Sequence, residues 1–149
     1  MKAVIPAAGF GTRFLPFTKS VPKELIPIVD KPVIQYVVEE AAESGIDDIL
    51  IIISAGKESI CQHFNPQFEL EQRLESSGKK QLLDELRNIG RGVRIQYVYQ
   101  QELDGLGGAL HFALTLGDDL REGVSDFVLV ASVEAFLADL GVEGHYRPK

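Results

Sequence analysis

One run of apolar residues constrains the fold more than any other feature of this sequence. Residues 48–54 read Asp-Ile-Leu-Ile-Ile-Ile-Ser, with five aliphatic side chains in succession. An unbroken apolar run of this length is typical of a strand buried on both faces, as in a parallel sheet covered by helices. The sequence therefore predicts an α/β protein.

The segments before this run fit the same architecture. Residues 3–5 form a short apolar stretch, and apolar side chains then recur at helical spacing between residues 33 and 42. We expect Asp30 to cap this helix, Pro32 to lie in its first turn and Gly45 to end it. A strand, a helix and a second strand in this order predict a right-handed crossover between parallel strands.

The later part of the chain continues the pattern and adds a charged segment. The predicted elements are a helix over 57–64, a helical insertion over 66–92 that is broken at 76–78, and strands over 94–99 and 126–131. With 149 residues, 45% of them hydrophobic, the chain has the size and core expected of one soluble domain. We therefore expect a single domain over residues 1–149 with a mainly parallel sheet.

Two glycines and an arginine follow the first strand, in the segment Ala7-Ala-Gly-Phe-Gly-Thr-Arg13. Glycine lets the backbone turn sharply, and successive N–H groups can then form a concavity that binds anions. Lys19 and Lys23 add positive charge further along the same loop. A dinucleotide-binding loop would need a glycine where Phe14 stands, and the Gly-Lys-Ser/Thr of a Walker loop is absent. The segment predicts another kind of phosphate loop; the alternative is a Gly-rich turn with solvated basic residues.

Residues 6–30 form a connection far longer than the roughly 2–6 residues usual between a strand and a helix. Ligands of open α/β sheets bind beyond the carboxyl ends of the strands. This loop therefore stands where a nucleotide should bind.

A second polar segment, residues 100–108, follows the predicted strand 94–99 and reads Gln-Gln-Glu-Leu-Asp-Gly-Leu-Gly-Gly. A glutamine side chain offers both a donor and an acceptor, which complement the imide edge shared by uracil and thymine. Glycine lets a base approach the backbone. The alternative is that Gln100 only ends the strand and the glycines only begin a helix.

The overall charge and the cysteine content limit the other function classes. A formal net charge of −7 argues against a general nucleic-acid binder. We expect no membrane segment and a cytoplasmic location, because no apolar run is long enough to cross a bilayer or to form a signal peptide. Cys61 is the single cysteine and is expected to act as a small buried hydrophobe. The isolated histidines, His63, His111 and His145, are expected to be structural or solvated.

The phosphate loop, its continuation over 22–36, and the segments 68–71 and 100–107 together resemble the sugar-1-phosphate nucleotidyltransferases. The closest resemblance is to bacterial UTP–glucose-1-phosphate uridylyltransferases, over about residues 1–118. It implies the N-terminal part of a Rossmann-like α/β/α sandwich. It also implies that UTP reacts with glucose 1-phosphate in the presence of Mg²⁺, giving UDP-glucose and pyrophosphate.

The resemblance further implies roles for individual residues. Arg13 and Lys23 would hold the UTP phosphates and supply the charge neutralisation on which phosphoryl transfer depends. Uracil would contact Gln100 and Gly105, along with the backbone of Ala8 and Gly9. The implied nucleotide-binding set is Ala8, Gly9, Gly11, Thr12, Arg13, Lys23, Gln100 and Gly105.

This sequence departs from the family pattern at several positions. The aspartate that holds Mg²⁺ in the family falls at Val133, so Glu134 is the nearest candidate metal ligand. We expect the two residues to lie in an extended segment, where adjacent side chains point to opposite faces, so only a shift of one residue would bring Glu134 into reach. Gly108 stands where the family usually has histidine, and Asp104 adds a negative charge beside the predicted base.

The family's sugar-binding half is expected to be absent from these 149 residues. Two hypotheses remain, a shortened uridylyltransferase and a non-catalytic UTP-binding module, with the product of a truncated reading frame as a third. dTTP in place of UTP, completion of the site by another chain, and a homo-oligomer also remain open.

Overall fold

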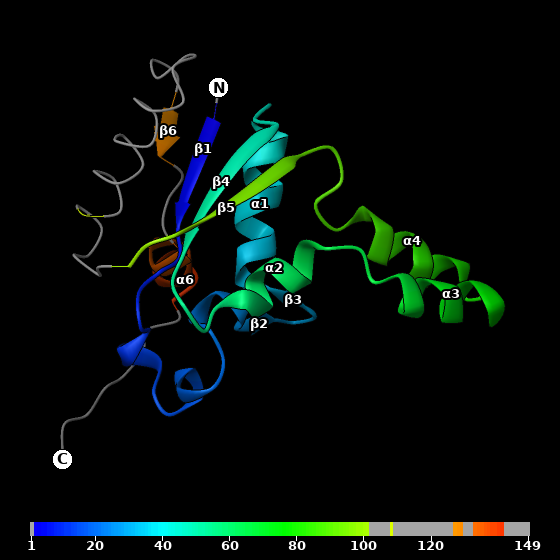
Figure 1. The fold of residues 1–149 in the computed structure, drawn as a ribbon, viewed down its shortest axis with the longest axis horizontal. Coiled ribbons are helices and arrows are strands. Elements are labelled where there is room, and N and C mark those ends of the chain that lie inside the picture. Colours follow the sequence, from blue (N-terminus) through cyan, green and yellow to red (C-terminus); the bar gives the residue numbers. More distant parts are fainter. Residues whose placement is uncertain (1, 102–107, 109–126, 130–132, 142–149) are drawn as a thin grey trace.

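The computed structural model describes residues 2–101, 108, 127–129 and 133–141, and gives only the backbone for 127–129 and Glu134. Its main sheet contains β1 (Lys2–Pro6), β4 (Asp48–Ile53), β5 (Arg94–Tyr99) and β6 (Phe127–Leu129). The strand order is β5-β4-β1-β6, and every neighbouring pair is parallel (Figure 1). The predicted α/β class and parallel sheet are confirmed.

Helices pack against this sheet and extend to one side of it. They are α1 (Val33–Glu43), α2 (Glu58–Phe64), α3 (Phe68–Ser76), α4 (Lys80–Asn88) and α6 (Val133–Asp139). The main core joins one face of β1 and β4 to α1 and α6. On β4, Ile49 and Ile51 point into this core, while Ile52 joins a smaller cluster with Val4 and Ala8. The strand is therefore buried on both faces, as its apolar run predicts.

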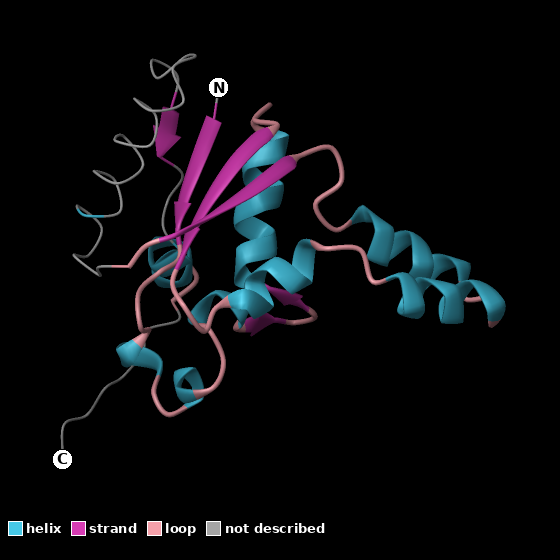
Figure 2. Cartoon of the chain, in the orientation of Figure 1, coloured by secondary structure: helices cyan, strands magenta, loops and turns pink. Residues whose placement is uncertain are grey.

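The start of α1 differs from the sequence-based expectation. The helix begins at Val33, and Pro32 occupies the capping position without any side-chain cap. Asp30 lies instead in the short hairpin of β2 (Pro27–Ile28) and β3 (Lys31–Pro32), visible below the sheet in Figure 2. The Val33 N–H donates to the carbonyl of Ile26 at 3.0 Å, so the backbone provides what a capping side chain would have provided.

The end of α1 follows the prediction. Gly45 adopts a left-handed conformation, with φ of 82°. The N–H groups of Gly45 and Ile46 donate to the carbonyls of Ala42 and Ala41. Glycine adopts this conformation without the steric cost of a Cβ, so it terminates the helix.

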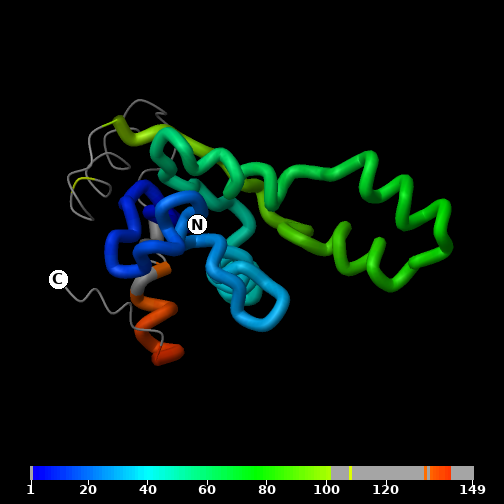
Figure 3. Tube along the Cα trace, turned by 90° about the horizontal axis from the view of Figure 1, so that it is seen from below, coloured from blue at the N-terminus to red at the C-terminus, as the bar shows by residue number. Residues whose placement is uncertain are grey.

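The predicted insertion over 66–92 forms a helical arm that projects away from the sheet (Figure 3). It consists of α3 and α4, separated near Gly78, whose φ is 70°. Most of its side chains are exposed, and Leu83 is the buried residue of its two helices. Of the helices that the structure describes, none combines the length and the hydropathy needed to cross a membrane.

Some sequence predictions fall outside the described residues. These are the predictions for His111, His145, Asp104 and Gly105.

Candidate functional site

The carboxyl ends of β1, β4 and β5 meet at one edge of the sheet. The Ala7 N–H donates to the carbonyl of Ile52 at 2.7 Å, and the Gln100 N–H donates to that of Ile53 at 2.8 Å. The hydroxyl of Ser54 donates to the carbonyl of Ala8 at 2.8 Å. Two of the predicted nucleotide-binding residues, Ala8 and Gln100, therefore flank the same strand end.

The long loop after β1 turns back on itself through three 3₁₀ turns: Thr12–Phe14, Phe17–Lys19 and Lys23–Leu25. Gly11 begins the first turn in a left-handed conformation, with φ of 65° and ψ of 35°. Thr18 Oγ1 donates to the Gly11 carbonyl at 2.7 Å and closes the loop. A Cβ on Gly11 would lie 3.1 Å from Thr18 Cγ2 and 3.2 Å from Lys23 Cβ. Both the conformation and the space therefore require glycine here.

Lys23 extends across this loop toward the end of β1. Its side chain is 7% exposed, and its Nζ lies 3.5 Å from the position that a Cβ on Gly9 would occupy. Because Gly9 has no side chain, its backbone is not covered on the side that faces the Lys23 ammonium. The structure brings Ala8, Gly9, Gly11 and Lys23 together, as the sequence predicts for a phosphate-binding group.

The structure also describes three other predicted residues. Thr12 and Arg13 lie in the first 3₁₀ turn and are exposed. Gln100 is 8% exposed and directly follows β5. Gly105 lies outside the described residues.

The placement of Glu134 corrects one step of the sequence argument. We expected Val133 and Glu134 to lie in an extended segment with side chains on opposite faces, but Val133 is the first residue of α6. Successive residues of a helix differ in direction by about 100° rather than 180°. Val133 is fully buried in the core, and the side chain of Glu134 is outside the described part of the structure.

No group of three or more His, Cys, Asp or Glu side chains that could hold a metal ion occurs among the described residues. Magnesium typically uses one or two carboxylates together with substrate phosphates.

A buried ion pair beside the loop was missed from the sequence. Lys57 Nζ lies 3.0 Å from Glu24 Oε1 and 2.9 Å from Glu24 Oε2, and the exposed fractions of the two residues are 7% and 0%. Burial raises the pKa of Glu24, and the charge of Lys57 opposes this effect. The sequence places Lys57 only at the start of a helix and gives no sign that it meets Glu24.

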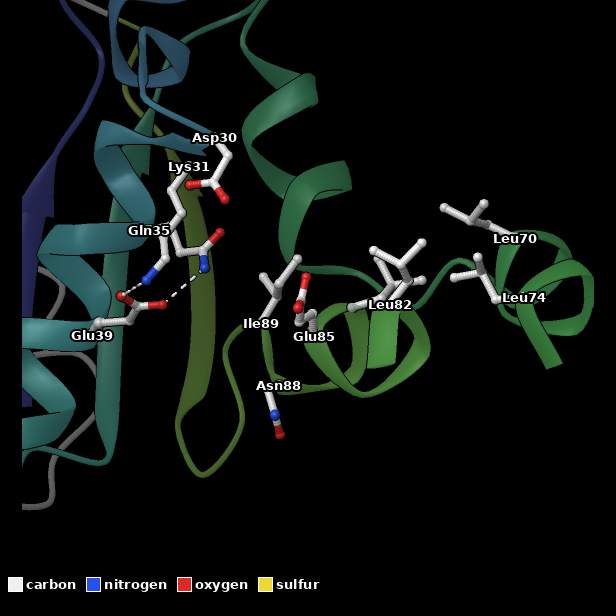
Figure 4. A pocket seen from close by; sticks show the side chains of 11 residues that line it. Asp30, Lys31, Gln35, Glu39, Leu70, Leu74, Leu82, Glu85, Asn88 and Ile89 are labelled. Carbon is white, nitrogen blue, oxygen red and sulfur yellow. Dashed lines mark hydrogen bonds and ion pairs between the residues drawn. The ribbon is translucent and has the colours of Figure 1, made fainter. Parts of the chain in front are cut away.

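A separate groove of about 600 Å³ lies between α1 and the helical arm (Figure 4). Leucines of the arm line one side, and Gln35 and Glu39 of α1 line the other. Gln35 also bonds to His63 of α2 at 2.9 Å, and burial lowers the pKa of His63. His63 is thus a structural residue, as expected. The groove contains none of the predicted nucleotide-binding residues.

Cys61 is half-buried, and its burial raises the pKa of the thiol. A raised thiol pKa disfavours the nucleophilic thiolate. The prediction of a small buried hydrophobe is confirmed only in part, because Cys61 packs against the main core but is not fully buried.

The fold and the loop are those of a nucleotidyl transferase. The sequence matches the nucleotidyl transferase family over residues 2–138, and the chain belongs to this family. Among curated relatives, it is 54% identical over 129 residues to the UTP–glucose-1-phosphate uridylyltransferase YngB of Bacillus subtilis (strain 168). That alignment covers 80% of this chain and 43% of the relative.

Two further relatives support the same assignment. The chain is 50% identical over 131 residues to a UTP–glucose-1-phosphate uridylyltransferase of Staphylococcus epidermidis, covering 81% of this chain and 46% of the relative. The structure of a UTP-bound UGPase from Acinetobacter baumannii matches with a TM-score of 0.77 and 43% identity, over 86% of this chain and 44% of the other. The resemblance seen in the sequence and the Rossmann-like fold are confirmed. The chain spans less than half the length of these relatives.

Proposed function

We propose that this chain forms the UTP-binding part of a UTP–glucose-1-phosphate uridylyltransferase. The observation that carries the proposal is the position of Lys23, whose ammonium lies beside Gly9 at the carboxyl edge of the sheet. An ammonium and glycine N–H groups at the end of a parallel strand suit a phosphate chain. The names of the similar proteins support UTP as the nucleotide.

In this proposal the residues divide between the two ends of the nucleotide. Lys23, Arg13 and the backbone of the Gly9–Thr12 region bind the phosphates. Gln100 and Gly105 contact uracil, with the backbone of Ala8 and Gly9 beside the base. dTTP is the alternative nucleotide, because the imide edges of thymine and uracil are alike.

The proposed reaction needs positioning and charge neutralisation rather than a covalent enzyme intermediate. An oxygen of glucose 1-phosphate attacks the α-phosphorus of UTP, and pyrophosphate leaves from the opposite side. Lys23 and Arg13 orient the triphosphate and offset its charge. Mg²⁺ accompanies UTP in the proposal, with Glu134 as a candidate carboxylate.

A non-catalytic UTP-binding module is the second candidate. It is favoured by Val133, which is fully buried and stands where the resemblance places the family's metal-holding aspartate. It uses the same loop and the same Lys23, so the two candidates differ only in turnover.

Isothermal titration calorimetry with UTP and Mg²⁺ tests binding, and addition of glucose 1-phosphate with detection of pyrophosphate tests turnover. We expect Lys23→Met to weaken UTP binding about tenfold or more, since a hydrogen bond to a charged group contributes about 1.5–3 kcal/mol. Lys79→Met, on the exposed arm, is the matched control and should bind UTP normally.

The results separate the candidates. Binding with pyrophosphate release supports the enzyme, and binding without release supports the module. Absence of UTP binding, or an equal effect of the two lysine substitutions, would refute the proposed site. Parallel titrations with dTTP and ATP measure base selectivity.

A further inference from the structure

The buried pair of Glu24 and Lys57 lies directly behind the proposed phosphate lysine. Lys23 and Glu24 are consecutive residues of one 3₁₀ turn, Lys23–Leu25. Their Cα atoms are therefore held about 3.8 Å apart by a trans peptide bond. Any displacement of the Glu24 backbone also displaces Lys23.

Lys57 holds Glu24 with a well-defined geometry. Its ammonium donates to both carboxylate oxygens of Glu24, at 3.0 Å and 2.9 Å. Glu24 is completely buried. Charge-assisted bonds to both oxygens of a carboxylate fix its orientation as well as its position. Because Glu24 and Lys57 are both buried, water has little access to their hydrogen-bonding groups.

Lys57 is itself fixed to the sheet. Its N–H donates to the carbonyl of Ser54 at 3.2 Å, immediately after β4, and its carbonyl accepts from the N–H of Ile60 at 3.0 Å. Ile60 is fully buried in the main core. The pair therefore connects the loop that carries Lys23 to a rigid strand end.

The rest of the loop is held by other contacts, such as the bond from Ser54 to Ala8 and the packing of Leu25 against the main core. Its 3₁₀ turn is closed by the bonds from Leu25 N to Pro22 O and from Ile26 N to Lys23 O, which act within the turn. Ile26 additionally accepts from Val33, which joins the following segment to α1. Of the side-chain bonds given above, the pair is the one that joins this turn to the end of β4.

We propose that Glu24 and Lys57 are positioning residues that set Lys23 against Gly9 for binding of the triphosphate. The inference rests on the proposed function for its ligand. Neither Glu24 nor Lys57 contacts the nucleotide in this account. Their effect should therefore depend on the number of phosphates and not on the base.

The test compares Glu24→Met/Lys57→Met, which replaces the pair by apolar side chains, with Lys57→Arg, which retains a charge pair. Titrations use UTP and UMP with each full-length chain. We expect the double variant to bind UTP roughly tenfold to hundredfold more weakly, as displacement of a binding group by about 1 Å can do. UMP affinity should change much less, and Lys57→Arg should recover most of the UTP affinity.

Other outcomes would overturn the inference. Equal UTP affinity in the double variant and the native chain would show that the pair does not position Lys23. Equal losses for UTP and UMP would indicate a general structural effect. If the double variant does not fold, Glu24→Gln provides the test, with an expected several-fold loss for UTP and none for UMP.

A measurement without nucleotide distinguishes failure of this inference from failure of the proposed function. The rate at which an amine-reactive reagent labels Lys23 is followed by peptide mass spectrometry in the native chain and in the double variant. We expect Lys23 to be labelled several-fold faster when the pair is removed, with labelling of Lys79 unchanged. An unchanged Lys23 rate would refute the positioning role, whether or not the chain binds UTP.

Discussion

Replacement of Lys57 by methionine should destabilise the fold by leaving the Glu24 carboxylate without its ionic partner. At 2.9 Å, the attraction of two unit charges is about 6 kcal/mol for an effective dielectric constant near 20. Glu24 can limit this loss by taking up a proton. Keeping it neutral at pH 7, against an ordinary pKa of 4.5, costs about 3 kcal/mol.

The pH dependence follows from the sign of the pKa change. Without Lys57, the folded-state pKa of Glu24 rises further above 4.5, because burial then acts unopposed. A raised folded-state pKa favours folding at low pH, and this contribution is lost as the pH rises through the folded-state value. The loss of about 3 kcal/mol at pH 7 should therefore fall below about 1 kcal/mol at pH 5.

Urea denaturation of the native chain, Lys57→Met and Glu24→Met/Lys57→Met at pH 5, 6 and 7 measures these free energies of unfolding. Replacement of both charges by apolar side chains should leave stability within about 1–2 kcal/mol of the native value. If Lys57→Met lowers the free energy of unfolding by the same amount at every pH, the reasoning is refuted. So would a double variant that is less stable than Lys57→Met at pH 7.

Three further predictions concern separate parts of the structure. Gly11→Ala should lower the free energy of unfolding by about 1–2 kcal/mol or more, because it places a Cβ on a residue in the left-handed conformation, close to Thr18. Urea denaturation measures this loss, and an unchanged stability would contradict the prediction. Burial beside Gln35 lowers the pKa of His63 and favours the neutral imidazole. The free energy of unfolding should therefore fall as the pH drops below 6.5, and His63→Gln should make this fall smaller in urea denaturation. Gln100→Leu should weaken UTP binding several-fold in calorimetry while leaving the affinity for inorganic tripolyphosphate unchanged, since Gln100 contacts only the base in the proposed site. Equal losses for both ligands would contradict the proposed role.

Much of the fold could be predicted because its signals are local. The apolar run that became β4 and the helical spacing of α1 each record the environment of one element. The break between α3 and α4 falls at the predicted Ser76-Ser77-Gly78. The capping of α1 could not be predicted, since the bond from Val33 to Ile26 arises from a hairpin that is too short to leave a periodic pattern.

The candidate site was predicted in part for a similar reason. Gly9, Gly11 and Lys23 lie in one loop, and the loop's composition indicates anion binding. The convergence of Ala8 and Gln100 follows from the parallel sheet, since the carboxyl ends of β1, β4 and β5 meet at one edge. The extended conformation assigned to Val133 was wrong because a helix begins at that residue.

The sequence by itself determined the α/β class, the phosphate-type loop and the family, because these depend on apolar periodicity, glycine positions and short motifs. The tertiary structure alone decided that Glu24 meets Lys57, a residue 33 positions away, behind Lys23. Each of the two would be read from the sequence as an ordinary solvated charge. Their pairing requires the loop after β1 to fold over the end of β4, where burial makes the interaction of opposite charges strong and the absence of a partner costly.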